Sequence, residues 1–332
     1  MPKIVFFEVA SWEREKLKKS FPQALLINKP LNEENVSDFV DFEIASCFIY
    51  SHFSKSIIEK MPNLKLIATR STGFDHIDVD FCHKKNITVC NVPEYGSRTV
   101  AEHTFALILT LTRKIYQSIN QAKNLDFNHE KIRGVDLFGK TLGVLGLGKI
   151  GKEVVKIAHG FGMNILVHTR TQDELLAKEL NFSYKNLDEL LSQADIISLH
   201  LPLTNETKHI INKNNLSKIK KGSFLVNTAR GGLVETEALV LGLKEGIFEG
   251  VALDVLEGEK ELMEEIQILI ESYQKKTDLK TLVLDHILFN HPNVIITPHN
   301  AFNTKEALFR ILEMTIQNIK SFLKNQPINT LG

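Results

Sequence analysis

The amino-acid sequence predicts an α/β protein with two parallel sheets. Short apolar runs alternate with amphipathic segments in a first block up to Val92 and in a second block from Leu142. Parallel neighbours cannot be joined by a tight hairpin, so this alternation indicates parallel strands connected by helical crossovers. The length of 332 residues fits two domains, since a domain usually holds roughly 100–200 residues.

Strands of the first block are predicted at five apolar runs: Ile4–Val9, Ala24–Ile27, Ile44–Tyr50, Leu64–Ala68 and Ile87–Val92. Segments with helical periodicity lie between several of them. From Thr99 to about Leu125 the pattern predicts one long helix, because side chains such as Phe105 and Leu109 recur at a three-to-four spacing. We expect this helix to lead from the first block towards the second.

Six further strands are predicted in the second block: Leu142–Leu145, Ile165–Val167, Ile196–Leu199, Phe224–Val226, Val251–Leu253 and Val294–Ile296. Their alternation with helical segments is typical of a doubly wound sheet. A final helix is expected over Asn303–Lys324, whereas the first block has no closing helix of its own. We therefore expect a discontinuous first domain, residues 1–99 and 300–332, around an inserted domain of residues 100–299. The charged segment Glu257–Asn290 is interpreted as an insertion beside a site or an interface.

Charge and composition exclude several classes of function. The 40 Lys and Arg residues balance 40 Asp and Glu residues, whereas nucleic-acid binders usually carry a basic excess. Cys47, Cys82 and Cys90 form no C-x-x-C pair, which argues against a disulfide scaffold or a thiolate metal site. The apolar start is short and leads into a charged run, and no apolar run approaches the ~18 residues of a membrane span. We expect a cytoplasmic protein that binds no nucleic acid, metal ion or membrane.

Two glycine motifs compete as nucleotide sites. Gly134–Thr141 matches the G-x-x-x-x-G-K-T loop of nucleoside triphosphatases. That loop must follow a strand and open a helix, so that backbone N–H groups meet the phosphates. Here a polar stretch precedes the motif and the strand-like run Leu142–Leu145 follows it. The order is wrong for a triphosphatase.

The second glycine motif, Gly146-Leu-Gly148-Lys149-Ile150-Gly151, directly follows that strand and opens a helical pattern. In such a turn the first glycine permits the sharp bend, the second lets the backbone approach a pyrophosphate, and the third allows close helix–strand contact. Anionic phosphates also favour the positive end of a helix. The motif predicts a dinucleotide site; the alternative is a tight turn without a ligand.

The cofactor preference stays open. The next strand should end in an acidic residue that binds the adenosine ribose of NAD, but Thr169 and Arg170 stand there. A cation without a carboxylate suits the 2′-phosphate of NADP(H). The alternative is an exposed arginine that contacts nothing, with NAD(H) as the cofactor.

Four further segments carry recognisable motifs: Arg70–Asp78, Asn91–His103, Val226–Leu233 with Asp254–Glu259, and Thr297–Phe302. Together with the second glycine motif they resemble, in order and across essentially the whole chain, the D-isomer-specific 2-hydroxyacid dehydrogenases. The ending His-x-Ala-Phe-x-Thr304 and the long segment after Glu259 look most like D-lactate dehydrogenases within that family. The resemblance implies two Rossmann-like or flavodoxin-like domains, one for the substrate and one for the dinucleotide.

Reduction of a 2-keto acid needs a cation for the carboxylate and carbonyl, and a proton donor for the developing alkoxide. By resemblance the catalytic set is Arg230, Glu259 and His299. The guanidinium of Arg230 matches a carboxylate in geometry, and His299 carries an imidazole, the type of side chain that most often serves as a general acid or base. Glu259 would favour the protonated imidazole by its opposite charge. Glu257, two residues away, makes the assignment of Glu259 the least secure of the three.

The resemblance implies further site residues. Backbone N–H groups of Thr72 and Gly73 would receive the substrate carboxylate, and Tyr95 and Phe302 would line the pocket, with core packing as the alternative for the two aromatic residues. Asp254 would contact the nicotinamide carboxamide. Positions that match the lining of the cofactor site are Pro202, Thr207 and Thr228. His103 is interpreted as a packed histidine.

The function predicted is that of an NAD(P)-dependent D-2-hydroxyacid dehydrogenase, with pyruvate or a close relative as the 2-keto acid. A glyoxylate or hydroxypyruvate reductase is the alternative within the class. A nucleotide-sensing corepressor-like binding module is the alternative outside it. The resemblance also implies a homodimer formed through the long Thr99–Leu125 helix and its polar extension.

Overall fold

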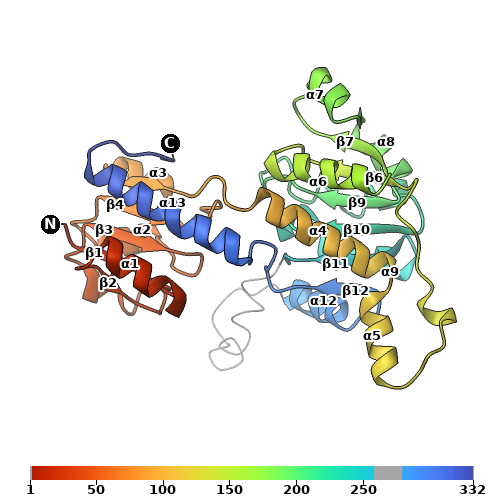
Figure 1. The fold of residues 1–332 in the computed structure, drawn as a ribbon, viewed down its shortest axis with the longest axis horizontal. Coiled ribbons are helices and arrows are strands. Elements are labelled where there is room, and N and C mark those ends of the chain that lie inside the picture. The colour runs from red at the N-terminus through yellow and green to blue at the C-terminus, as the bar shows by residue number, and fades with distance from the viewer. Residues whose placement is uncertain (1, 258–278, 332) are drawn as a thin grey trace. The chain divides into compact units, whose positions relative to one another are not determined.

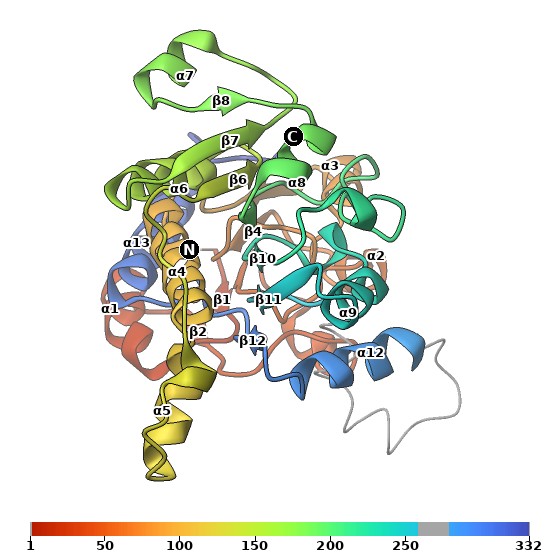
Figure 2. The ribbon, with the colours of Figure 1, turned by 90° about the vertical axis from the view of Figure 1, so that its right-hand side faces the viewer.

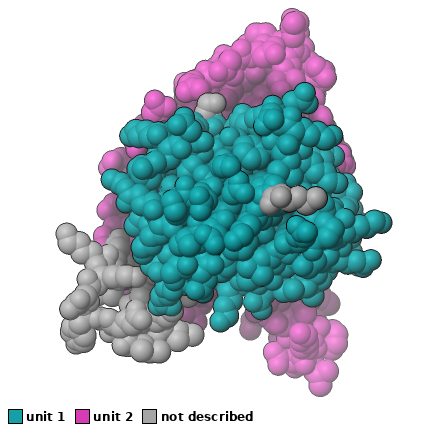
Figure 3. Space-filling model, turned by 90° about the vertical axis from the view of Figure 1, so that its left-hand side faces the viewer, with its two compact units in different colours: residues 1–96, 303–332 teal, residues 97–302 magenta. Residues whose placement is uncertain are grey.

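The computed structural model describes residues 2–257 and 279–331 and contains two compact units (Figure 1). Unit 1 comprises residues 1–96 and 303–332, and unit 2 comprises residues 97–302. Figure 3 shows the two units in separate colours. The expected domain boundaries, 99/100 and 299/300, lie close to these divisions. Unit 1 is discontinuous in sequence, since the carboxyl-terminal segment belongs to it.

Unit 1 contains a five-stranded sheet in the order β2-β1-β3-β4-β5, with every pair parallel. The strands are β1 (Ile4–Phe6), β2 (Leu25–Leu26), β3 (Ile44–Cys47), β4 (Leu66–Thr69) and β5 (Thr88–Cys90). The helices are α1 (Arg14–Ser20), α2 (Lys55–Glu59), α3 (Val79–Lys84) and α13 (Lys305–Leu323), with 3-10 turns η1 (Ser11–Glu13) and η2 (Val36–Phe39). Each strand predicted for the first block is present, and most end earlier than the apolar run.

Alternating side chains of unit 1 enter two cores, one on each face of the sheet, as expected for successive residues of a strand. Phe6 of β1 packs in one core with Leu17 of α1 and Leu312 of α13. Its neighbour Val5 enters the opposite core with Ile57 of α2. The carboxyl-terminal helix therefore covers one face of a sheet built from the amino-terminal residues, as the missing closing helix predicted.

Unit 2 contains a parallel seven-stranded sheet in the order β12-β11-β10-β9-β6-β7-β8. The strands are β6 (Thr141–Leu145), β7 (Asn164–His168), β8 (Ser183–Tyr184), β9 (Ile196–Leu199), β10 (Ser223–Asn227), β11 (Phe248–Leu253) and β12 (Val294–Ile296). The helices are α4 (Ser97–Thr112), α5 (Ile115–Lys123), α6 (Lys149–Gly160), α7 (Glu174–Glu179), α8 (Leu187–Gln193), α9 (Thr236–Lys244) and α12 (Leu279–Phe289), with 3-10 turns η3 (Glu130–Ile132), η4 (Leu216–Lys218) and η5 (Gly231–Leu233). The short edge strand β8 was not predicted.

Helices cover both faces of the unit 2 sheet (Figure 2). Ile196 of β9 joins Phe105 of α4 and Val154 of α6 in one core. The next residue, Ile197, joins Leu239 of α9 in the other. This arrangement is the doubly wound sheet that the second block predicted. No helix in the described part of the chain is long and apolar enough to cross a membrane.

The prediction of one long helix over Thr99–Leu125 is wrong, because the chain breaks between α4 and α5. Lys114 has a left-handed φ of 48°, and the carbonyl of Thr112 accepts from the N–H of Val135 at 2.8 Å. Gly134 allows this approach, since a Cβ there would lie 2.4 Å from the carbonyl oxygen of Thr112. The backbone of the returning chain therefore replaces the next turn of the helix.

The same Gly134 begins the G-x-x-x-x-G-K-T sequence. Thr141 at its end is the first residue of strand β6, so no helix follows the motif. The structure agrees with the exclusion of a triphosphatase loop. The predicted insertion Glu257–Asn290 contains α12, and its residues 258–278 lie outside the described part of the chain.

Candidate active site

The second glycine motif forms the turn between β6 and α6. Gly146 has a φ of 98°, and a Cβ there would lie 2.7 Å from the carbonyl oxygen of His200. A Cβ on Gly151 would lie 2.2 Å from the carbonyl oxygen of Gly146. Glycine is therefore needed at the first and third positions because the backbone leaves no room for a Cβ, as the motif predicted.

Gly148 differs from these two glycines because a Cβ there would meet no atom within 4 Å. It is exposed and is the N-cap of α6, where no side chain caps the first turn. The exposed Lys149 begins the helix, whereas Ile150 packs against the core beneath it. Open space above uncapped helical N–H groups fits the pyrophosphate of a dinucleotide.

Strand β7 ends at His168, and the two residues that decide the cofactor preference follow it. Thr169 is half-buried and Arg170 is exposed. Arg170 forms no ion pair with another described residue. Its guanidinium is thus available to a ligand at the edge where a dinucleotide ribose is expected.

Three residues expected to line the cofactor site occupy different environments. Pro202 is exposed after β9, and the hydroxyl of Thr207 donates to its carbonyl oxygen at 2.6 Å. Thr228 is buried after β10, and its hydroxyl oxygen lies 3.0 Å from that of Thr104 in α4. Pro202 and Thr207 shape one loop at the sheet edge, whereas the hydroxyl of Thr228 is used in packing.

The loop that carries Arg230 is fixed by a buried asparagine. The side-chain Nδ2 of Asn227 donates to the carbonyl of Arg230 at 2.9 Å, and its Oδ1 accepts from the N–H of Ala229 at 3.0 Å. Gly231 packs so closely that a Cβ would lie 2.0 Å from the carbonyl oxygen of Leu256. The guanidinium, whose Nη1 also donates to the carbonyl of Ala229 at 2.8 Å, therefore extends from a rigid backbone.

His299 lies in a loop that Asp254 holds. The carboxylate of Asp254 accepts from the hydroxyl of Thr297 at 2.5 Å and from the N–H groups of Asn300 and Ala301 at 2.8 and 2.9 Å. The N–H of His299 donates to the carbonyl of Asp254 at 3.0 Å, and its φ of 49° is left-handed. The carboxylate and the backbone carbonyl of Asp254 thus both hold the loop in which His299 lies.

His103 of α4 completes this arrangement. Its Nε2 lies 3.4 Å from Oδ1 of Asp254 and 3.3 Å from the hydroxyl oxygen of Thr297. Burial alone would raise the pKa of the Asp254 carboxyl, but hydrogen bonds from His103, Thr297 and the two N–H groups outweigh it and hold the pKa below its ordinary value. Asp254 is therefore ionised and positions the loop. Its predicted contact with a nicotinamide carboxamide stays a prediction.

The three loops meet at one edge of the sheet. Arg230, Asp254 and His299 follow β10, β11 and β12, which are adjacent parallel strands. Asn227 pairs with Leu253 in register, and the next pair, Leu253 and Ile296, is also in register. The carboxyl edge of an open α/β sheet is where such folds bind ligands.

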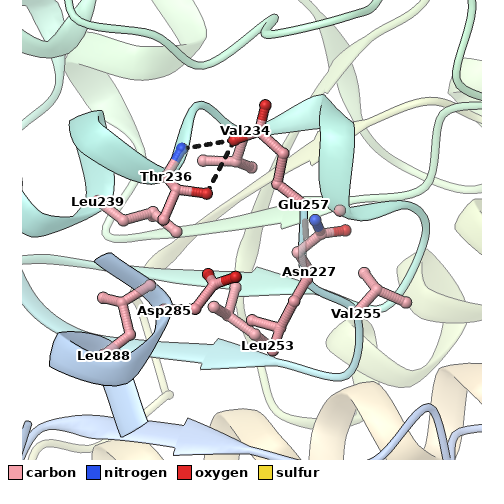
Figure 4. A pocket seen from close by; sticks show the side chains of 11 residues that line it. Asn227, Val234, Thr236, Leu239, Leu253, Val255, Glu257, Asp285 and Leu288 are labelled. Carbon is pink, nitrogen blue, oxygen red and sulfur yellow. Dashed lines mark hydrogen bonds between the residues drawn. The ribbon is translucent and has the colours of Figure 1, made fainter. Parts of the chain in front are cut away.

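The carboxylate of Glu257 is hydrogen-bonded to two neighbouring side chains. Its Oε1 accepts from Nε2 of His209 at 2.5 Å, and its Oε2 accepts from the N–H and hydroxyl of Thr236 at 3.0 and 2.8 Å (Figure 4). Both oxygens thus accept hydrogen bonds from His209 and from Thr236, the first residue of α9. Glu259, the predicted partner of His299, lies outside the described residues.

The predicted carboxylate-binding loop of unit 1 follows β4. Thr72 is exposed and Gly73 is half-buried, and among the described residues no group accepts from either backbone N–H. The Thr72 hydroxyl donates to the carbonyl of Val92 at 2.6 Å, and the Ser71 hydroxyl donates to the carbonyl of Gly73 at 2.6 Å. Two neighbouring N–H donors in an ordered loop fit an anion.

Tyr95 and Phe302, the predicted aromatic residues, are both half-buried. Tyr95 belongs to unit 1, where its carbonyl accepts from Nε of Arg310 at 2.6 Å. Phe302 is the last residue of unit 2 and follows the loop that Asp254 holds. Whether they contact a substrate stays a prediction, but neither is a fully buried core residue.

Sequence reasoning missed the contacts that position these groups. His103 and Asp254 are far apart in the chain, and no local pattern predicts that α4 brings the imidazole to this carboxylate. Asn227 carried a usable signal, because an asparagine that ends a buried strand often hydrogen-bonds its own loop.

Comparisons with known sequences and structures found related proteins. The sequence model described as "D-isomer specific 2-hydroxyacid dehydrogenase, NAD binding domain" matches residues 105–301. A 2-hydroxyacid dehydrogenase homolog of Zymomonas mobilis is 37% identical over 298 residues, covering 89% of this chain and 88% of that protein. A D-lactate dehydrogenase of Curvularia clavata is 34% identical, covering 91% and 84%. The structure of Aquifex aeolicus D-lactate dehydrogenase with NAD and lactic acid has a TM-score of 0.86 and 38% identity, covering 98% and 96%.

Proposed function

Because the chain belongs to the D-isomer-specific 2-hydroxyacid dehydrogenase family, we propose that it interconverts pyruvate, or a close 2-keto acid relative, and the D-2-hydroxy acid. The chain is an oxidoreductase of the kind that acts on the CH–OH group of 2-hydroxyacids. One observation carries the proposal: Arg230 and His299 follow β10 and β12, the two strands that flank β11, and hydrogen bonds hold their loops at one sheet edge.

Each of these residues has a role that its chemistry supports. When bound, a reduced nicotinamide would supply the hydride that C2 of the keto acid accepts. Arg230 binds the carboxylate and polarises the carbonyl through paired N–H donors. His299 donates the proton that the developing alkoxide needs, and it accepts that proton in the reverse direction. Asp254 holds the backbone of His299 throughout.

Glu259 is the proposed carboxylate partner of His299. Glu257 is the alternative, but its two oxygens already accept hydrogen bonds from His209 and Thr236. A carboxylate beside the imidazole favours its protonated form, which is the form that donates in reduction.

For unit 1 we propose that the N–H groups of Thr72 and Gly73 bind the substrate carboxylate. Their lack of acceptors among the described residues supports this role. Tyr95 and Phe302 are proposed to limit the size of the substrate side chain. The names of two relatives, which are D-lactate dehydrogenases, favour a methyl side chain and therefore pyruvate.

The cofactor is a nicotinamide dinucleotide held at the turn of Gly146, Gly148 and Gly151. We propose that the exposed Arg170 lets NADPH bind as well as NADH, because its guanidinium has no ion pair among the described residues and suits a 2′-phosphate. The absence of an acidic residue at Thr169 and Arg170 also removes repulsion of that phosphate.

A homodimer is proposed through the segment that begins with α5. No residue of α5 is buried, and the helix projects from the body of unit 2 (Figure 2). Exposed apolar side chains gather along this segment: Ile115, Tyr116, Ile119, Leu125, Phe127, Val135 and Phe138. Light scattering should give a dimer mass, which Tyr116→Lys with Phe127→Lys reduces to that of a monomer. An unchanged mass would reject this interface.

The central experiment is an assay of NADH and NADPH oxidation with pyruvate, glyoxylate, hydroxypyruvate and larger 2-keto acids. The proposal expects the highest kcat/KM with pyruvate or a close relative and a D-configured product. A preference for glyoxylate or hydroxypyruvate would assign the alternative reductase. Tight cofactor binding without turnover of any keto acid would contradict the proposal.

A further inference from the structure

In unit 1, two consecutive peptide groups are held at their carbonyl oxygens by residues 91 and 92. The N–H of Val92 donates to the carbonyl of Ser71 at 3.0 Å. The side-chain Nδ2 of Asn91 donates to the carbonyl of Thr72 at 2.8 Å. These carbonyls belong to the peptides whose N–H groups are those of Thr72 and Gly73.

The direction of the two N–H groups follows from this geometry. In a planar trans peptide the N–H points opposite to the C=O. Because both carbonyls point towards residues 91 and 92, the N–H groups of Thr72 and Gly73 both point away from them. Two adjacent donors are thus presented on one side of the loop, where no described residue accepts from them.

Asn91 is itself fixed by the carboxyl-terminal part of unit 1. Its carbonyl accepts from Nδ2 of Asn318 in α13 at 2.8 Å, and its N–H donates to the carbonyl of Asn329 at 3.1 Å. Nδ2 of Asn329 donates to Oδ1 of Asn318 at 2.8 Å. Asn318 is fully buried and Asn91 is 7% exposed, so water cannot readily replace these bonds.

We propose that Asn91 is a positioning residue for the substrate carboxylate, acting through the Thr72 and Gly73 N–H groups. The inference rests on the proposed function, since that function places the carboxylate at these donors. Asn91 makes no contact with the carboxylate itself. It fixes the direction of the Gly73 N–H and polarises its peptide, because a hydrogen bond to a carbonyl strengthens the N–H on the other side.

The chemistry of the position explains why an amide is needed there. The group that faces the carbonyl of Thr72 must donate a hydrogen bond. An aspartate of the same shape is a donor only when it is protonated. When ionised, it repels the carbonyl oxygen and turns the peptide away from the direction that serves an anion.

The test is the affinity of Asn91→Asp for oxamate, a carboxylate analogue of pyruvate, measured by calorimetry with NADH present. At about pH 8 we expect a Kd at least about ten-fold above that of the unaltered enzyme, as for a lost hydrogen bond to a charged group. The ratio of the two Kd values should fall towards one as the pH is lowered to about 5, because burial beside a carbonyl oxygen raises the pKa of the introduced carboxyl and its protonated form donates again. The Kd for NADH alone should stay the same.

A matched control is Asn35→Asp. Nδ2 of Asn35 also donates to a backbone carbonyl of unit 1, that of Pro30 at 2.9 Å, but far from the 71–73 loop in sequence and without a contact to it. This variant should keep the unaltered Kd for oxamate at both pH values. Loss of affinity in both variants would indicate a general loss of stability and overturn the inference.

The outcomes separate this inference from the proposed function. An unaltered enzyme that neither binds oxamate nor reduces a keto acid would reject the proposed function. An enzyme that binds oxamate equally well with and without Asn91→Asp would reject only the role of Asn91. If Asn91→Asp fails to fold, Asn91→Ser decides, since it removes the Nδ2 bond to the carbonyl of Thr72 without adding a charge. Weaker oxamate binding by that variant supports positioning by Asn91, and unchanged binding overturns it.

Discussion

The backbone N–H of His299 donates to the carbonyl oxygen of Asp254 at 3.0 Å, although His299 has a left-handed φ of 49°. A non-glycine residue in that conformation costs roughly 1–3 kcal/mol, which the surrounding structure must offset. Asp254 offsets this cost with four hydrogen bonds to residues 297–301, which its carboxylate and its backbone carbonyl accept. The proposed proton donor is therefore held in place by its neighbour in the sheet.

Asp254→Asn tests this arrangement through the pH dependence of stability. The variant cannot accept from both N–H groups, so we expect the free energy of unfolding to fall by about 1–3 kcal/mol at neutral pH. The pKa of Asp254 is lowered on folding, so its stabilisation is present above the ordinary carboxyl pKa and is lost as the pH falls through the folded value. Urea unfolding at several pH values measures the free energy of unfolding of both proteins. If the difference in this free energy stayed constant as the pH is lowered into the acid range, it would contradict the role of the Asp254 carboxylate.

Gly146→Ala and Gly148→Ala form a matched pair for the cofactor turn. At Gly146 the positive φ and the 2.7 Å approach to His200 predict strain, so Ala should lower both stability and cofactor affinity. At Gly148 the φ of −71° and the open space accommodate a methyl group. There, Ala should leave the melting temperature unchanged and weaken NADH binding, because the methyl enters the space for the pyrophosphate. Thermal unfolding and cofactor titration distinguish the two, and equal cofactor affinity of Gly148→Ala and the unaltered enzyme would argue against a phosphate at this turn.

Glu257→Gln and Glu259→Gln identify the carboxylate that acts on His299. Loss of the true partner removes the negative charge that favours the protonated imidazole, so the decline of the reduction rate on the alkaline side should move to lower pH. We expect this shift only for Glu259→Gln. Glu257→Gln should lower stability by weakening the bonds to His209 and Thr236. A shifted pH profile for Glu257→Gln alone would reverse the assignment.

Arg170→Ala tests the contact with a 2′-phosphate. We expect the KM for NADPH to rise about ten-fold, as for a lost hydrogen bond to a charged group, while the KM for NADH changes little. Thr169→Asp is the complementary variant, since a carboxylate there should favour NADH and repel NADPH. Equal responses to the two cofactors in steady-state kinetics would show that Arg170 does not contact the phosphate.

Regular patterns predicted most of the fold. Parallel strands such as the buried β9 and the half-buried edge strand β12 consist of short, mostly apolar and β-branched runs, so their bounds agree with the prediction. The edge strand β8 consists only of Ser183–Tyr184, and it is too short and too polar to show the alternation of apolar and polar residues that marks a strand. The break at Lys114 also had no local signal, because a backbone contact from residue 135 ends the helix.

The candidate site was predictable where residue type and spacing define the chemistry. The spacing of Gly146, Gly148 and Gly151 predicted a sharp bend and a close contact, which the turn has at Gly146 and Gly151, and Gly148 has open space around it. The groups that position the site were not predictable in this way. His103 and Asn91 act through residues distant in sequence, and such contacts arise only once the sheets have formed.

The most direct test of the proposed mechanism is the rate of NADH oxidation by His299→Ala with saturating pyruvate, together with its Kd for NADH. Loss of a general acid costs about 10²–10⁴-fold in rate, so kcat should fall by this amount while cofactor affinity remains that of the unaltered enzyme. A variant that retains near-native turnover would show that His299 does not supply the proton.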